Sequence, residues 1–258
     1  MTVPCPSLTD RTVLLTGASR GIGAATARTL AEHGARLVAQ YRSGRDGAER
    51  ATAGLDADRR LLLAADFAEP GAARRLWRDA VAWRGRIDAV VVNAASLPQT
   101  PFDGSDDDWD GGWEQAMRVN VLEPAALIRE AVAHFLEHGG GTLVVLSSWA
   151  AEQGSRIPSL AAYAASKAAL RNLAQTVART HAADGILVHV LAPGVVRTEM
   201  AAASDDLRPG GVRVEDTLAS GRLVEPDEVA RLIALLASGA FPNLSGATLD
   251  MNGASYVR

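Results

Sequence analysis

Tyr163 and Lys167 stand four residues apart in an alanine-rich stretch that contains no glycine or proline. Alanine is the best helix former, so we expect a helix here, and residues i and i+4 of a helix share a face. An ammonium group beside a phenol favours the phenolate, which should lower the pKa of Tyr163 from about 10. Such a phenol can act as a general acid–base. The same spacing also occurs on ordinary helix surfaces, so the pair needs support from the rest of the chain.

A cluster of glycines near the N-terminus gives that support. Residues 11–16 are apolar and β-branched, residues 17–23 read Gly-Ala-Ser-Arg-Gly-Ile-Gly, and a helix should follow and end at Gly34. Glycine lets the backbone approach a pyrophosphate, and a helix N-terminus attracts negative charge. The spacing G-x-x-x-G-x-G differs from the common G-x-G-x-x-G fingerprint. Its position between a strand and a helix still favours a dinucleotide-binding turn over a plain turn.

Strands and helices alternate along the chain, a pattern typical of a parallel sheet covered on both faces. The predicted strands are 11–16, 36–41, 60–65, 87–92, 142–147, 186–191 and 246–250. The predicted helices are 22–33, 45–54, 70–84, 113–138, 158–182 and 227–238. The predicted fold is therefore α/β, a single Rossmann-type doubly wound domain spanning 1–258 with about seven parallel strands. In such a sheet, ligands bind beyond the carboxyl ends of the strands, where the glycine turn lies.

Together these motifs resemble the short-chain dehydrogenase/reductase family, and the resemblance covers nearly all of residues 8–253. Both Ser147 and Ser148 follow a strand as the catalytic serine of the family does, and Ser148 fits the pattern better. The catalytic residues that the resemblance implies are Asn120, Ser148, Tyr163 and Lys167. The cofactor-binding residues that it implies, together with the charge argument below, are Gly17, Ser19, Arg20, Gly21, Ile22, Gly23, Tyr41, Arg42, Ser43, Asp66, Phe67, Asn93, Ala94, Ala95, Tyr163, Lys167, Pro193, Gly194, Val196 and Thr198.

The resemblance implies an oxidoreductase that transfers hydride between a nicotinamide and a ketone or secondary alcohol. Tyr163 would exchange the proton with the substrate oxygen, and Ser148 would hydrogen-bond that oxygen and stabilise its charge. Lys167 would hold the nicotinamide ribose, and Asn120 would sustain a water link from Lys167 to solvent. The 199–222 region corresponds to a substrate lid in the family, although a plain surface loop is the alternative. Family members also form homodimers or homotetramers through the equivalents of the 113–138 and 158–182 helices.

Charge at the end of the second predicted strand indicates which nicotinamide cofactor is used. Members specific for NAD carry an aspartate there, whereas this chain has Tyr41 followed by Arg42 and Ser43. Arg42, together with Arg20 in the glycine turn, could attract the 2′-phosphate of NADP, because guanidinium suits phosphate geometry. The alternative is two solvated surface arginines. We expect NADP(H) rather than NAD(H), with Asp66 either contacting the adenine or capping the next helix.

Three departures from the family pattern concern loops. Ala95 replaces the glycine that usually ends the motif after the fourth strand. The gap between Ser148 and Tyr163 is about two residues longer than usual, which should bulge the 153–159 loop beside the substrate. Ala254 stands where a second glycine is common. None of these removes a catalytic group.

Other candidate sites have plainer explanations. His134 and His138 have a spacing that could bind metal, but no further ligand type clusters near them, so we expect a solvated helix end and no metal site. The acidic residues from 106 to 110 lack the glycine and terminal Glu of a calcium loop, and acids favour a helix start. Trp149 could face the substrate or serve packing. Four lid-region arginines could meet an acidic acyl carrier or keep the lid soluble: Arg197, Arg208, Arg213 and Arg222.

Composition agrees with this interpretation. Hydrophobic residues make up 48% and charged residues 22% of the 258 residues, as in ordinary globular proteins. A net charge of −4 argues against a nucleic-acid-binding surface. The single cysteine, Cys5, excludes an internal disulfide and is typical of a reducing compartment. Residues 1–10 form a leader without the features of a signal peptide, and no apolar run could span a membrane, so we expect a cytoplasmic protein.

The substrate is the least determined property. The pattern looks most like 3-oxoacyl-carrier-protein reductases, while sugar- and steroid-type alcohol dehydrogenases share the same core motifs. A non-catalytic NADP-binding regulator is the alternative from a different class. The intact set of catalytic residues favours an enzyme.

Overall fold

The computed structural model describes residues 7–205, 207 and 213–257, so Cys5, Arg208 and most of the predicted leader lie outside the described residues. Its centre is a seven-stranded sheet in the order β3-β2-β1-β4-β5-β6-β7, with every neighbouring pair parallel. The strands are β1 Thr12–Leu15, β2 Arg36–Tyr41, β3 Arg60–Ala64, β4 Ala89–Val92, β5 Gly141–Leu146, β6 Ile186–Pro193 and β7 Thr248–Met251. The predicted α/β fold is confirmed, and the ends of the predicted strands are shifted by at most two residues.

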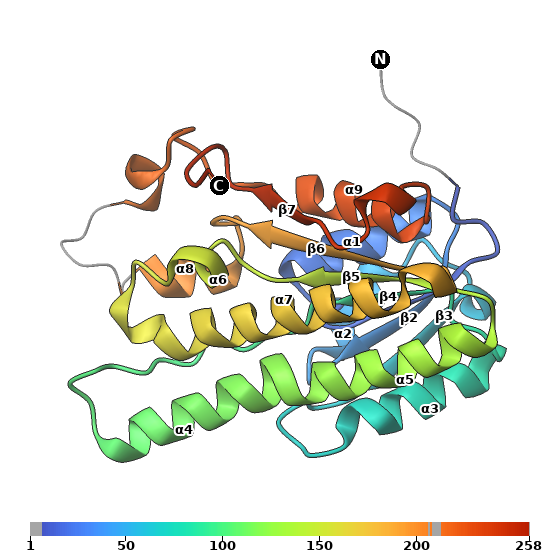
Figure 1. The fold of residues 1–258 in the computed structure, drawn as a ribbon, viewed down its shortest axis with the longest axis horizontal. Coiled ribbons are helices and arrows are strands. Elements are labelled where there is room, and N and C mark those ends of the chain that lie inside the picture. Colours follow the sequence, from blue (N-terminus) through green and yellow to red (C-terminus); the bar gives the residue numbers. More distant parts are fainter. Residues whose placement is uncertain (1–6, 206, 208–212, 258) are drawn as a thin grey trace.

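Helices cover both faces of this sheet (Figure 1). The α-helices in the described residues are α1 Gly21–Glu32, α2 Arg45–Ala51, α3 Ala72–Arg84, α4 Asp106–Met117, α5 Glu123–Glu137, α6 Ala150–Gln153, α7 Ala161–His181, α8 Glu199–Asp205 and α9 Pro226–Ala237. Helices α3, α5 and α7 lie on one face, and α1 packs against α9 on the other. No helix in the described part of the chain is long and apolar enough to cross a membrane.

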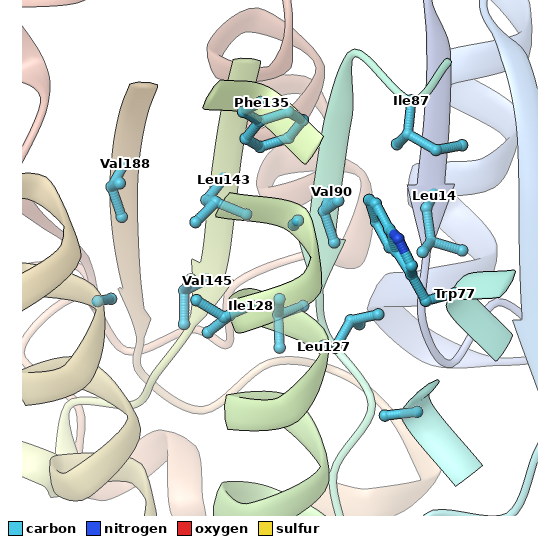
Figure 2. Close-up of a cluster of buried hydrophobic side chains, with 14 of the residues drawn as sticks. Leu14, Trp77, Ile87, Val90, Leu127, Ile128, Phe135, Leu143, Val145 and Val188 are labelled. Carbon is cyan, nitrogen blue, oxygen red and sulfur yellow. The ribbon is translucent and has the colours of Figure 1, made fainter. Parts of the chain in front are cut away.

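Side chains that alternate along the strands divide the core into two layers. On one face, Leu14, Val90 and Leu143 meet α5 and the indole of Trp77 from α3 (Figure 2). On the other face, strand residues pack against α1 and α9. Because strands buried on both faces need apolar side chains throughout, they appear in the sequence as continuous apolar runs.

The long helix predicted over 113–138 is wrong in two respects. Helix α4 begins earlier, at Asp106, because the Ser105 side chain accepts a hydrogen bond from the backbone N–H of Asp108 and acids in a first turn suit the helix dipole. A π-helical turn, Arg118–Leu122, then separates α4 from α5. Such turns frequently mark functional positions, and this one carries the buried Asn120.

The segment between Ser148 and Tyr163 contains more structure than the predicted bulge. Helix α6 occupies residues 150–153, a bend follows, and a 3-10 turn at Pro158–Leu160 leads into α7. The 3-10 turn explains why the helix predicted from residue 158 begins as an α-helix only at Ala161. The segment is fixed to the loop after β4, because the buried Thr100 donates its backbone N–H to the carbonyl of Ser159 at 2.6 Å.

Candidate active site

The glycine turn joins β1 to α1 in a conformation that requires glycine. Gly17 and Gly21 have φ values of 73° and 53°, in the left-handed region that other residues rarely adopt. A methyl group on Gly23 would lie 1.9 Å from the carbonyl oxygen of Gly17. The N-cap residue of α1, Arg20, makes no side-chain capping bond, so the first N–H groups of the helix have no such partner. An open cradle of backbone N–H groups at the start of a 12-residue helix fits a pyrophosphate.

Three polar side chains hold this turn against the sheet. The buried Gln40 of β2 accepts a hydrogen bond from the N–H of Gly17 at 2.7 Å and donates one to the carbonyl of Ala65 at 2.6 Å. Thr16 accepts from the N–H groups of Asn93 and Ala94 at 2.9 and 3.0 Å. The Asn93 amide in turn donates to the carbonyl of Thr16 at 2.9 Å. Gln40 was not predicted as a site residue, and its only signal was a polar residue near the end of an apolar strand.

The predicted proton-transfer residues meet where β5 ends and α7 begins. The Ser148 hydroxyl hydrogen-bonds Tyr163, and the Lys167 Nζ atom lies 5.9 Å from the centre of the Tyr163 ring. Lys167 donates a hydrogen bond to the carbonyl of Leu146 at 2.8 Å, and its backbone carbonyl accepts one from Ser147 at 3.0 Å. Of the two serine candidates, therefore, Ser148 faces the phenol, while Ser147 fastens the strand to the helix.

The predicted lowering of the Tyr163 pKa is wrong for this structure. Burial raises the pKa of Tyr163 above its ordinary value, and the hydrogen bond with Ser148 opposes that rise. Burial also lowers the pKa of Lys167 to about 8. The helical spacing correctly predicted that the Tyr163 and Lys167 side chains lie side by side. It could not reveal that burial shifts both of their pKa values. A phenol with a raised pKa retains its proton at neutral pH and can donate it.

Asn120 connects three parts of the site through its amide. Its oxygen accepts from the N–H of Ser96 at 2.8 Å, while its nitrogen donates to the carbonyl of Ser96 at 3.0 Å and to the hydroxyl of Ser166 at 2.9 Å. Ser166 donates to the carbonyl of Tyr163 at 2.7 Å. All the polar atoms of the amide are thus engaged with the loop after β4 and with α7. Ser96 and Ser166 were not predicted, and the position of Ser166 between Tyr163 and Lys167 was the only signal for it.

The Pro193-Gly194 step closes the same edge of the sheet. The carbonyl of Pro193, at the end of β6, accepts from the N–H of Trp149, and Gly194 donates to the carbonyl of Met251 at 2.9 Å. A methyl group on Gly194 would lie 2.9 Å from the Cβ atom of Asn252, so glycine permits this close approach. Thr198 lies opposite the glycine turn, with its methyl 3.1 Å from where a Cβ atom on Gly21 would stand.

The remaining predicted cofactor residues lie around the ends of β1, β2 and β3. Tyr41 and Phe67 are buried, and Ile22 and Val196 join the core layer of α1 and α9. Ser43 accepts the N–H of Arg45 through its carbonyl, and Ser19 packs against the start of α2, where a Cβ atom on Gly47 would lie 2.3 Å from its carbonyl. Ala95, the first departure, is partly buried and follows Ala94 in the loop after β4.

The two arginines proposed for the 2′-phosphate differ. Arg20 forms an exposed ion pair with Glu199 at 3.1 Å, whereas Arg42 is exposed and has no ion-pair partner among the residues that the structure describes. Asp66 accepts the N–H of Ala68 at 2.9 Å and does not cap α3. The start of α3 is capped by the buried Glu123, whose carboxylate accepts the N–H groups of Gly71 and Ala73.

The weaker candidates are explained by structure. Among the described residues no cluster of three or more His, Cys, Asp or Glu side chains could hold a metal ion. The expectation of a solvated helix end is wrong for His134, which is buried. Its ring stacks on that of His138 at 3.9 Å and accepts the N–H of Ile87. Arg197 pairs with Glu225 at 2.9 Å. Arg213 pairs with Asp216 at 2.9 Å, and Arg222 lines a surface cavity of about 460 Å³ that none of the predicted catalytic residues lines.

Comparison with known proteins agrees with this geometry. A family model described as enoyl-(acyl carrier protein) reductase matches residues 17–253. The chain belongs to the short-chain dehydrogenase/reductase family. It is 36% identical over 251 residues to cis-4-hydroxycyclohexanecarboxylate dehydrogenase of Sinomonas cyclohexanicum, covering 95% of this chain and 96% of that one. As a member of the family, the protein is an oxidoreductase.

Solved structures show the same fold. The 3-oxoacyl (acyl-carrier-protein) reductase of Agrobacterium tumefaciens with NADP bound has a TM-score of 0.84 at 30% identity, covering 96% of this chain and 95% of that chain. The 3-ketoacyl-(acyl-carrier-protein) reductase of Brucella melitensis in complex with NADH also has a TM-score of 0.84, at 25% identity, covering 97% of this chain and 100% of that chain. Similar folds in this family therefore hold either nicotinamide cofactor.

Proposed function

We propose that the protein is an NADP(H)-dependent oxidoreductase that interconverts a ketone and a secondary alcohol, with a 3-oxoacyl compound or a similar carbonyl as substrate. The observation that carries the proposal is the hydrogen bond between Ser148 and Tyr163 beside the buried Lys167. This group lies at the same sheet edge as the glycine turn. The bound nicotinamide supplies the hydride chemistry.

The protein's own residues then handle the proton and the charge. Tyr163, whose pKa is raised by burial, holds its proton until the substrate oxygen accepts it. Ser148 donates a hydrogen bond to the same oxygen and stabilises the charge that develops there. Asn120 fixes the first turn of α7 through Ser166, so the phenol stays aligned. The glycine turn and Asn93 would hold the dinucleotide.

Preference for NADP rests on Arg42. It follows β2, has no ion-pair partner in the described part of the chain, and adjoins Tyr41 rather than an acid. Arg20 contributes less than the sequence suggested, because Glu199 already neutralises it. The NADP-bound structure of the Agrobacterium tumefaciens reductase supports the proposal, and the NADH complex of the Brucella melitensis reductase represents the alternative.

Replacing the proton donor tests the catalytic assignment. In Tyr163→Phe, NADPH should still bind while its oxidation by a panel of ketones stops, as followed by fluorescence. Full activity in this variant would refute the assigned role. NADPH binding by the unaltered protein without turnover of any ketone would favour a regulator.

Replacing Arg42 tests the cofactor preference. Arg42→Asp should lower the ratio of NADPH to NADH activity, while Arg50→Asp, the same charge change on the exposed end of α2, should not. An unchanged ratio in Arg42→Asp would contradict the charge argument. A sugar- or steroid-type alcohol as substrate, a lid at 199–222 and a homodimer or homotetramer stay predictions from the resemblance. The cytoplasmic location stays a prediction from the composition and the N-terminal sequence.

A further inference from the structure

The chain segment that follows Ser148 places the side chain of Arg156 over the ring of Trp149. Trp149 follows Ser148 directly, and its N–H is fixed to the carbonyl of Pro193 at 3.0 Å. After α6 the chain bends, and the guanidinium carbon of Arg156 lies 5.4 Å from the centre of the Trp149 ring. This arginine belongs to the stretch between Ser148 and Tyr163 that is longer than the family pattern.

The Trp149 indole also contacts a cluster of apolar side chains, called here the apolar wall. Trp149 packs, together with Val195, against a small cluster of Val214, Leu218 and Leu223. A substrate whose carbonyl reaches the Ser148 hydroxyl therefore meets apolar side chains next to it. The guanidinium lies at the edge of the same wall, held by the indole through a cation–π contact.

Three other arginines near this wall have carboxylate partners, and Arg222, next to Leu223, lines the separate surface cavity described above. Arg171 pairs with Glu152, and Arg197 and Arg213 pair with Glu225 and Asp216. Arg156 has no carboxylate partner among the residues that the structure describes, and it is exposed. Stacking on an aromatic face leaves the N–H donors of a guanidinium available, and their planar fork matches a carboxylate.

We propose that Arg156 determines substrate specificity by binding the carboxylate of a small oxo or hydroxy acid. The apolar body of the substrate lies against Trp149, and its carbonyl or hydroxyl lies at Ser148 and Tyr163. This inference rests on the proposed function, because it names the class of carbonyl compound that the same site accepts. A neutral ketone of equal size lacks the group that Arg156 binds, and a carrier-bound thioester presents its charge elsewhere.

A pair of matched substrates tests the proposal. Reduction of 4-oxocyclohexanecarboxylate and of its methyl ester by NADPH is measured for the unaltered protein, Arg156→Gln and Arg156→Lys. The unaltered protein should prefer the acid. Arg156→Gln should lose about tenfold or more in kcat/KM for the acid, because it lacks the charged hydrogen-bond donor, and should keep its rate with the ester. Arg156→Lys should keep part of the preference.

Controls separate this role from packing and from the proposed function itself. Arg129→Gln, at an exposed position on α5, should leave kcat/KM unchanged for both the acid and the ester. Equal losses for acid and ester in Arg156→Gln, or a preference of the unaltered protein for the ester or for a carrier-bound 3-oxoacyl thioester, would overturn the carboxylate assignment. Turnover of neutral ketones alone would overturn it while leaving the proposed function standing. Turnover of no ketone at all would reject the proposed function.

Discussion

Lys167 donates its ammonium hydrogen bond to the main-chain carbonyl of Leu146, at 2.8 Å and in a buried position. Leu146 is the last residue of β5, and Ser148 follows two residues later. Because the Ser147 hydroxyl also binds the carbonyl of Lys167, helix and strand are fastened at two points. The lysine thus positions the phenol of Tyr163 against Ser148, in addition to any contact with cofactor.

The first prediction concerns the pKa of Lys167, which is the single lysine in the sequence. Burial disfavours its charged form and lowers its pKa to about 8. In protein labelled with ¹³C-lysine, one Cε resonance should therefore titrate with a midpoint near 8, and this is measurable without assignment. A midpoint near the ordinary lysine value of about 10.4 would show that burial does not act as described.

The second prediction is the effect of this pKa shift on the free energy of unfolding. Between pH 8 and 10.5 the unfolded chain still holds the lysine proton that the folded protein has released. The unfolded state binds more protons there, so the free energy of unfolding should rise with pH. Relative to Lys167→Met, which lacks the titrating group, the rise should approach about 3 kcal/mol across this window. Urea unfolding of both proteins at several pH values measures it, and parallel curves would contradict it.

The third prediction concerns the glycine turn. A methyl group on Gly23 collides with the backbone of Gly17, so Gly23→Ala should weaken NADPH binding by about tenfold or more, about 1.4 kcal/mol. Gly111→Ala is the matched control, because a Cβ atom there meets nothing within 4 Å and the residue is exposed in α4. That control should bind NADPH normally and gain about 0.5–1 kcal/mol of stability. NADPH titration and thermal unfolding measure the two effects.

Sequence patterns were sufficient where structure depends on neighbours along the chain. The apolar runs located all seven strands, and the Tyr163–Lys167 spacing put both groups at one site. Sequence patterns were insufficient where segments far apart in the chain meet. The direction of the shift in the Tyr163 pKa depends on burial by surrounding elements. The π-helical turn around Asn120 interrupts a helical pattern that is otherwise continuous in the sequence. Gln40 supports the glycine turn from 23 residues away, which no local pattern reveals.

Glu123 illustrates the same limit and gives the fourth prediction. Its buried carboxylate lies on α5 and accepts the N–H groups of Gly71 and Ala73, both at 2.8 Å, so it caps α3 from another helix. Glu123→Ala leaves both donors unpaired, a part-buried one at Gly71 and a buried one at Ala73, and should lower the free energy of unfolding by about 2–4 kcal/mol. Glu123→Gln keeps one acceptor oxygen and should lose about half as much. Equal unfolding midpoints in urea for all three proteins would contradict the capping role.

Ala254 gives the last prediction, because it departs from the glycine common in the family and the structure shows the consequence. Its φ of 61° is in the left-handed region, where a Cβ atom crowds the backbone at a cost of about 1–2 kcal/mol. Ala254→Gly should relieve this strain, although the freer unfolded chain offsets part of the gain, leaving about 0.5–1 kcal/mol. Ala133→Gly, an exposed helical position in α5, should instead lose about 1 kcal/mol. Opposite shifts of the unfolding midpoint in these variants would establish backbone strain at residue 254. A loss of stability in both would show that alanine adopts this conformation without strain.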